Sequence, residues 1–369
     1  MNNYYTCSSS FSGEFNKVCD QIVESITDYI LQLDCDALVN IHCSIFPGVV
    51  ILSGAVGQIN RTIPYEEIAK ETLRFIGYDN NKADFNCNTC TFINNIRNDT
   101  SWFLEEDMGS GEYGSVYGYA CSETMDFMPI AQTVAQNISV ITFSKAQKEE
   151  LYWLMPYGRC QVGARYENGK FKCIDSIIYS TRYKDVKDPK DIIPDITNIC
   201  NIATLGYKVD KNCKLYVNPL NDIPEAFGVS GVKAGENAYG PYCPIDVISV
   251  GKSLNYCARY GAYMARYMAK NFVAAGACDA MTVQLIYTAQ WDKPFEIDLN
   301  PVNAEVSVER LKEIANVVFN YNGKAIINNL KLRETQYLPY ACFGQYGRSE
   351  CNSPWEKLDK VDEIKESLR

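Results

Sequence analysis

The strongest constraint on the fold is the alternation of helical and strand-like stretches from the start of the chain. Apolar residues recur at four-residue spacing from Val18 to Ile26 and predict a helix from about Asn16 to Leu33. The stretch LVNIHCSIFPGVVILSGAV then predicts two strands around Gly48, and YEEIAKETLRFIGY predicts a second helix. An alternation of this kind indicates an α/β protein, in which helices cover mixed sheets.

The rest of the chain repeats this alternation. We predict an apolar stripe on the second helix, formed by Ile68, Leu73 and Phe75. Further strands are predicted at Lys172–Tyr183, Lys214–Asn218 and Met281–Ala289, and a long helix at Asn255–Ala275 that ends before Gly276. Three segments have the composition of linkers: 97–107, 184–195 and the charged tail 357–369.

The composition indicates a globular chain of two or three packed units. It has 369 residues, of which 47% are hydrophobic and 22% charged, so it can bury a large core. The net charge of −10 argues against nucleic acid as a partner, because phosphate backbones are bound by clustered Lys and Arg. No apolar run reaches the roughly 18 residues that a membrane-spanning helix needs.

The cysteines point to a reduced, cytoplasmic protein. There are 16 of them at irregular spacing, and no secretory signal supports a disulfide framework. The single C-x-x-C, Cys87–Cys90, has no second pair, and His42 is the one histidine. We therefore expect packing roles for these thiols rather than a zinc site or redox chemistry.

The Gly-rich stretch GSGEYGSVYGYA, Gly109–Ala120, allows two interpretations. Glycines at this density let a backbone approach a nucleotide closely, but the K-[ST] ending of a P-loop is missing. A tight turn leading into a strand is the favoured interpretation on this motif alone.

A series of motifs, in order along the whole chain, resembles the S-adenosylmethionine synthetase (methionine adenosyltransferase) family. They are KVCDQI, FIGYD, GSGEYGSVYGYACSET, YWLMP, SGVK, GKSLNYCARYGAYMARYMAKNFVAAG, FGQYGR and PWE. The resemblance implies three α/β domains related by pseudo-threefold symmetry, and a dimer with flat sheets and active sites at its interface. The implied bounds are 1–101, 108–224 and 225–357, with 102–107 as a shortened remnant of the gating loop and 358–369 as a charged tail.

The resemblance also implies a reaction and its cofactors. Family enzymes join the methionine sulfur to C5′ of ATP and release triphosphate, using Mg²⁺ and K⁺. This chemistry requires cations aimed at phosphate oxygens and a sulfur held in line with the bond that breaks.

Several residues that this chemistry needs are replaced. The family His that contacts the leaving oxygen falls at Glu14, and the Mg²⁺-binding Asp falls at Asn16, a weak metal candidate that keeps an oxygen without its charge. The gating-loop Gln is absent. Further replaced positions are His42, at the K⁺-binding Glu, and Ala55, Ala226, Val232, Tyr256 and Ala258. No catalytic residue is assigned from the sequence, and retention of the metal ions is in doubt.

Four charged residues are kept at family positions. Arg159, Lys233 and Lys252 stand at phosphate-contacting positions, and Glu112 keeps the charge of a methionine-side Asp. For each of the three cations taken singly, a solvated surface residue is the favoured interpretation. Their joint retention predicts that they converge on an anion, which makes ATP, polyphosphate and S-adenosylmethionine the candidate ligands.

Three functional hypotheses follow. In the first, the chain is a non-catalytic or half-site-contributing subunit of a methionine adenosyltransferase, paired with a more complete paralogous subunit or with itself. The second is a stand-alone pseudoenzyme that binds an adenosine or phosphate metabolite or a protein. The third is a self-sufficient synthetase with substitute ligands. The first hypothesis expects outward-facing strand positions near Val50 or Leu52 to meet the partner.

Overall fold

The structure is a computed structural model that describes residues 2–57, 59–79, 85–99, 110–184, 188–218, 227–289 and 291–369. The helices are α1 Phe15–Leu33, α2 Tyr65–Ile76, α3 Ile130–Gln147, α4 Ile193–Ala203, α5 Ala234–Asn237, α6 Cys257–Ala274, α7 Val308–Val318, α8 Gly323–Asn329 and α9 Val361–Leu368. The strands are β1 Asn2–Ser10, β2 Leu38–Phe46, β3 Val49–Gly57, β4 Thr91–Asn98, β5 Gly114–Cys121, β6 Leu154–Glu167, β7 Lys170–Tyr183, β8 Val209–Val217, β9 Gly228–Val229, β10 Ala280–Tyr287 and β11 Glu296–Val302. All the helices and strands predicted above by range are confirmed, with bounds shifted by a few residues.

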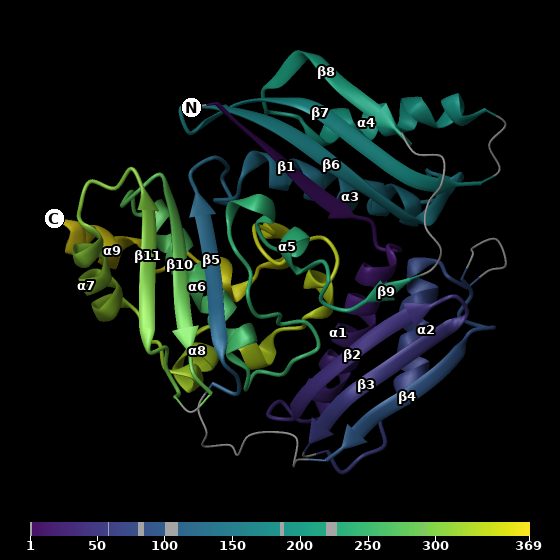
Figure 1. Cartoon of the computed structure of the whole chain (residues 1–369), viewed down its shortest axis with the longest axis horizontal. Coiled ribbons are helices and arrows are strands. Elements are labelled where there is room, and N and C mark those ends of the chain that lie inside the picture. The colour runs from purple at the N-terminus through teal and green to yellow at the C-terminus, as the bar shows by residue number, and fades with distance from the viewer. Residues whose placement is uncertain are drawn as a thin grey trace.

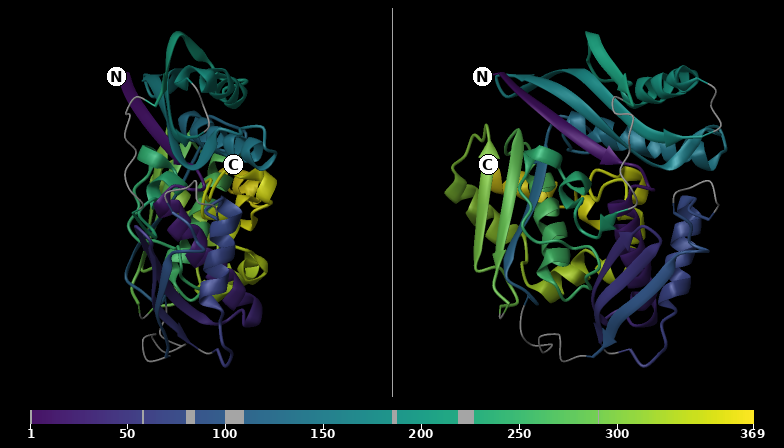
Figure 2. Two further views of the ribbon diagram at one scale, coloured as in Figure 1. Left: turned by 90° about the vertical axis from the view of Figure 1, so that its right-hand side faces the viewer. Right: turned by 45° about the vertical axis from the view of Figure 1, so that its right-hand side comes forward.

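In the described residues the strands form three separate sheets (Figure 1). Their strand orders are β4-β3-β2-β9, β1-β6-β7-β8 and β11-β10-β5. Most neighbours are antiparallel, whereas β4 runs parallel to β3 and β8 runs parallel to β7. Seen edge-on, strand β1 lies towards one side of the molecule and helix α3 towards the other (Figure 2, left). The predicted mixed α/β architecture is confirmed.

A common plan occurs three times along the chain. Each repeat consists of a strand, a helix and a hairpin: β1, α1 and β2–β3; β5, α3 and β6–β7; β9, α6 and β10–β11. The leading strand never joins the hairpin of its own repeat. Instead β1 pairs with β6, β5 with β10, and β9 with β2, each time antiparallel. This cyclic exchange closes the three repeats into one body and agrees with the predicted pseudo-threefold relation.

Helix α1 forms the core of the N-terminal unit. Its apolar residues from Val18 to Ile30 are fully buried against strands β2 and β3. The Glu14 side chain caps the helix by accepting a hydrogen bond from the Lys17 backbone N–H. The helix therefore begins one residue before the predicted start, at the point where the Glu14 carboxylate satisfies a free N–H group.

The side-chain orientations on β3 and α2 differ in how well the sequence predicts them. Val50 and Leu52 are 0% and 2% exposed and belong to the core, so the outward-facing position near them on β3 is Ile51. Phe75 does not belong to a buried stripe of α2, since it is 63% exposed, whereas Leu73 is fully buried. Period-2 alternation leaves either face possible until the sheet is placed against its helices.

The C-terminal tail is not a linker. Helix α9 packs against α6 and α7, and Ile364 is fully buried there. The predicted linker 184–195 is also wrong in its second half, because α4 begins at Ile193. Both segments are rich in charge, but one or two apolar side chains suffice to dock a short amphipathic helix on an existing core.

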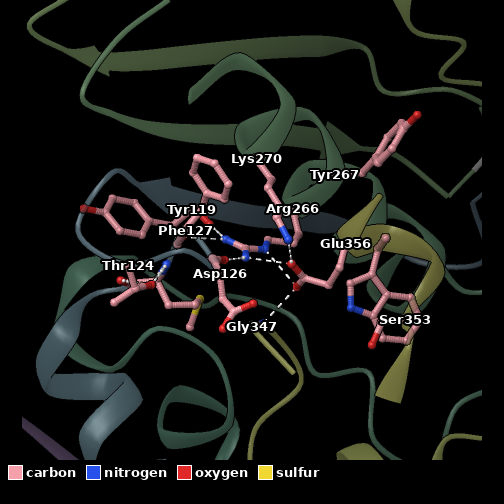
Figure 3. A network of polar contacts seen from close by, with 12 residues as sticks. Tyr119, Thr124, Asp126, Phe127, Arg266, Tyr267, Lys270, Gly347, Ser353 and Glu356 are labelled. Atoms are coloured by element: carbon pink, nitrogen blue, oxygen red, sulfur yellow. Dashed lines mark hydrogen bonds and ion pairs between the residues drawn. The ribbon is translucent and has the colours of Figure 1, made fainter. Parts of the chain in front are cut away.

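A buried ionic network fixes α6 to the C-terminal segment (Figure 3). Glu356 accepts hydrogen bonds from Arg266 at 2.8 Å and from Lys270 at 2.7 Å, and also from the Gly347 backbone N–H. The guanidinium of Arg266 also donates to three backbone carbonyls, those of Tyr119, Asp126 and Phe127. The two cations hold the pKa of Glu356 below its usual range despite burial, which opposes ionisation. The charged groups of this network are thus hydrogen-bonded to one another or to the backbone, as burial of charge requires.

Candidate functional site

The candidate site begins at the N-terminus of α1, where Glu14 and Asn16 hold each other. The Asn16 side-chain amide donates to the Glu14 carboxylate at 2.7 Å. The Asn16 amide oxygen accepts the backbone N–H of Val229 at 3.0 Å, which ties α1 to strand β9. The one side-chain oxygen that Asn16 offers is thus already used within the chain.

Directly below, Lys17 and Asp20 are buried between α1 and the segment after β9. The Lys17 ammonium donates to the side-chain oxygen of Asn237. One oxygen of Asp20 accepts the Gly231 N–H at 2.6 Å, and the other has no partner among the described residues. Burial, opposed by the charge of Lys17, raises the pKa of Asp20 to about 7.

Lys233 pairs with Glu236, and the backbone of Ser10, which stands opposite Arg159, binds the same carboxylate. The Lys233 ammonium is 3.6 Å from one carboxylate oxygen of Glu236, and the backbone N–H of Ser10 donates to the other. Ser10 stands opposite Arg159 in the pairing of β1 with β6. The Arg159 side chain is exposed, and no described residue forms an ion pair with it. We call Arg159, Lys233, Glu236 and Ser10 the Glu236 group.

Lys252 belongs to a second group. Its ammonium donates to the Glu112 carboxylate at 2.5 Å and lies 5.3 Å from the ring centre of Tyr256. The other oxygen of Glu112 accepts the N–H of Ala258 in the first turn of α6, at 3.1 Å. Burial and the nearby charge of Lys252 lower the pKa of His42. Lys233 thus pairs with Glu236 near the strand position of Arg159, whereas the contacts of Lys252 lead to Glu112 and α6.

The residues present do not fit the metal ions that the resemblance implies. Mg²⁺ prefers several oxygen ligands with anionic charge, and Asn16 supplies one neutral oxygen that already accepts a hydrogen bond. At the K⁺ position, His42 offers an imidazole instead of a carboxylate. Within the described ranges, no cluster of three His, Cys, Asp or Glu side chains has the geometry to hold a metal ion.

The Gly-rich stretch serves backbone packing. Gly118 in β5 lies so close to α6 that an added Cβ would be 2.0 Å from the Ala265 carbonyl carbon. Gly111 has a φ of 74° and faces the carbonyl of Asn255. The structure thus accounts for these glycines through the contact between β5 and the start of α6, whereas Gly109 lies outside the described residues.

The other replaced positions carry no charged side chain. Ala55, Tyr256 and Ala258 are buried, and Val232 is 63% exposed. Ala226 and the proposed gating-loop remnant 102–107 lie outside the described residues. All 16 cysteines are free thiols. No helix in the described part of the chain is long and apolar enough to cross a bilayer.

Sequence reasoning missed Glu236, Lys17 and Asp20. Glu236 follows Lys233 at the i, i+3 spacing that brings side chains together on a helical turn. This spacing in the sequence is enough to suggest that the two side chains form a pair. Lys17 and Asp20 had a weaker local signal, since both fall within a helix whose other residues are mainly buried. Their partners Asn237 and Gly231 are more than 200 residues away in the sequence, which no local pattern reveals.

Comparison with known proteins assigns the chain to a family. Three domain models match: S-adenosylmethionine synthetase N-terminal domain at residues 2–101, central domain at 107–223 and C-terminal domain at 223–357. S-adenosylmethionine synthase of Clostridium botulinum (strain Alaska E43 / Type E3) is 31% identical, with 100% of both chains covered. The enzyme of Helicobacter pylori (strain J99) is also 31% identical, over 98% of this chain and 97% of the relative. The chain therefore belongs to the S-adenosylmethionine synthetase family.

Proposed function

We propose that this chain is a non-catalytic or half-site-contributing subunit of a methionine adenosyltransferase, the enzyme that forms S-adenosylmethionine from ATP and methionine. The observation that carries the proposal is the carboxylate of Glu14, held at the N-terminus of α1 where the resemblance implies a histidine. The leaving triphosphate carries several negative charges. An anion at this position opposes its departure, whereas a protonated imidazole would assist it.

Asn16 supports the same conclusion. A metal ion offsets the charge that develops on a leaving phosphate, and its ligands must be free to turn towards it. The Asn16 oxygen instead accepts the Val229 N–H, and its amide nitrogen donates to Glu14. Glu14→His alone would leave the Asn16 oxygen bound to Val229. Asn16→Asp alone would leave the Glu14 carboxylate at the N-terminus of α1.

The second group supports a contribution to a partner's site. Glu112 and Lys252 both keep their charge, and they are positioned by the first turn of α6. The resemblance implies active sites between subunits, so a paralogous chain with the intact His and Asp could combine its residues with this pair. A self-dimer would lack such residues on both sides.

A second candidate function is a stand-alone binding protein. The observation that favours it is the exposed guanidinium of Arg159, which forms no ion pair among the described residues and lies opposite Ser10 in the strand pairing. An arginine in that state is available to a phosphate or carboxylate ligand, or to an acidic protein surface.

The test is turnover of the purified chain, alone and mixed with a paralogous synthetase, with ATP, methionine, Mg²⁺ and K⁺ present. We expect the chain alone to work at a small fraction of the partner's rate, because Glu14 and Asn16 replace two groups that each act on the leaving phosphate. Mixing should raise the rate above that of the partner alone. Robust steady-state activity of the isolated chain would contradict the proposal, and an unchanged rate on mixing would favour the binding protein.

The same test identifies the surface used for association. Ile51 lies on the outer face of β3, so Ile51→Lys should abolish both association and stimulation if the sheet meets the partner. The matched control is Phe75→Lys, which introduces the same charge at an exposed apolar residue of α2. Equal loss with both variants would argue against a specific sheet interface.

A further inference from the structure

We propose that Glu236 is a built-in counter-anion, which occupies the place of an anionic ligand beside Lys233 and so excludes polyphosphate from the Glu236 group. This inference deepens the proposed function and rests on it for the identity of the site. The proposal distinguishes between the candidate ligands. Glu236 would exclude ATP and polyphosphate, which carry phosphate groups, but not S-adenosylmethionine, which carries none.

The contacts of Glu236 are those that a phosphate would make. Phosphate oxygens are bound in proteins by ammonium groups and by backbone N–H groups. The carboxylate of Glu236 takes one of each: the Lys233 ammonium at 3.6 Å and the Ser10 N–H. The side chains of Lys233 and Glu236 are 19% and 10% exposed, so water screens this pair only in part.

The surrounding charges leave little attraction for an added anion. Lys17 is fully buried and its ammonium is held by Asn237, out of reach of a ligand. Glu14 is 5% exposed and stays at the N-terminus of α1. Among the cations of this part of the described chain, Arg159 therefore remains as an exposed partner for phosphate, and one guanidinium does not balance several negative charges.

The second group repeats the arrangement. Glu112 also takes one ammonium, that of Lys252, and one backbone N–H, that of Ala258. The two carboxylates come from different segments of the chain, and each neutralises a lysine at a phosphate-contacting family position. Because the resemblance implies an acidic residue at Glu112 as well, this pair shows the same contacts, and Glu236 alone carries the inference of exclusion.

The test measures binding of inorganic tripolyphosphate to the full chain by calorimetry, at low ionic strength and without a partner. In Glu236→Gln the amide oxygen still accepts the Ser10 N–H, but the Lys233 ammonium is freed. We expect at least tenfold tighter binding than in the wild type, and Lys233→Ala added to this variant should cancel the gain. The control Glu305→Gln removes the same charge from an exposed residue and should bind as the wild type does.

Two results would overturn the inference. One is wild-type binding of tripolyphosphate as tight as that of Glu236→Gln, and the other is a gain that persists after Lys233→Ala. Thermal unfolding of each variant verifies that it folds. Should Glu236→Gln be unstable, Glu236→Ala repeats the measurement, because it also removes the carboxylate beside Lys233. Because no turnover is measured, a catalytically active chain would overturn the proposed function and leave this result unaffected.

Discussion

At the scale of single residues, the candidate site is satisfied by its own chain. Asn16, Lys17 and Glu236 each make their hydrogen bonds to other protein groups, where a catalytic site would hold them ready for a ligand. Asp20 is the exception, because one of its oxygens is buried without a partner among the described residues. A buried, half-satisfied carboxylate costs stability when it is ionised.

We expect Asp20→Asn to become more stable relative to the wild type as the pH rises. The pKa of Asp20 in the folded protein, about 7, lies above its ordinary value of 3.8, so the folded state holds an extra proton between these values. The stabilisation from this group is complete below about pH 4 and is lost as the pH approaches 7, whereas asparagine does not ionise. From below pH 4 to above pH 7 the relative gain should be on the order of 4 kcal/mol.

Urea unfolding of both proteins at several pH values checks this prediction. The exposed Asp362→Asn on α9 is the control for a removed carboxylate and should follow the wild type across the same range. If the difference in the free energy of unfolding between Asp20→Asn and the wild type does not vary with pH, folding does not raise the pKa of Asp20, and the prediction is wrong.

At the scale of elements, the contact between β5 and α6 connects the Gly-rich stretch to the candidate site. Gly118 lets the strand approach the helix backbone, and Glu112 at the start of the same segment binds the N-terminus of α6. Through these contacts the glycines position Glu112 against α6.

We expect Gly118→Ala to be strongly destabilising, by about 3 kcal/mol or more. The new Cβ would be 2.0 Å from the carbonyl carbon of Ala265 and 2.3 Å from the nitrogen of Arg266, and neither backbone atom can move aside without shifting the helix. Gly235→Ala in α5 is the control, because nothing lies within 4 Å of its added Cβ. Its free energy of unfolding, measured by chemical denaturation, should change by less than about 1 kcal/mol. Similar effects in both variants would contradict the close packing.

At the scale of the whole molecule, cyclic strand exchange makes the three repeats depend on one another. Helix α1 reinforces this dependence, since the Glu24 carboxylate binds the guanidinium of Arg259 in α6 at 2.7 and 2.9 Å. The side chains of both residues are almost fully buried. Such a pair joins the first repeat to the third.

We expect Glu24→Gln to lower the free energy of unfolding by about 3 to 5 kcal/mol, because Arg259 would remain as an uncompensated buried charge. The control Glu313→Gln removes a carboxylate that is 66% exposed and pairs with Arg310, and its effect should stay within about 0.5 kcal/mol. Denaturant unfolding measures both variants. A loss below about 1 kcal/mol for Glu24→Gln would mean that the pair does not join the repeats energetically.

The helices and strands follow from the amino-acid sequence alone, since their patterns are local. Helices α1 and α6 follow from apolar residues at helical spacing, and the β2–β3 hairpin follows from two β-rich stretches around Gly48. Family motifs along the whole chain likewise determined the three-part α/β plan and the positions of the charged candidates.

Which side chains contact one another depends on the folded arrangement of the whole chain. The face on which Val50 lies depends on the helix packed against its sheet, and the docking of α9 depends on a core built elsewhere. Lys252 meets Glu112 across 140 positions, and the Ser10 N–H meets Glu236 across 226. Contacts at such separations arise from chain topology, which local periodicity does not encode, and they determine that the retained lysines are already paired.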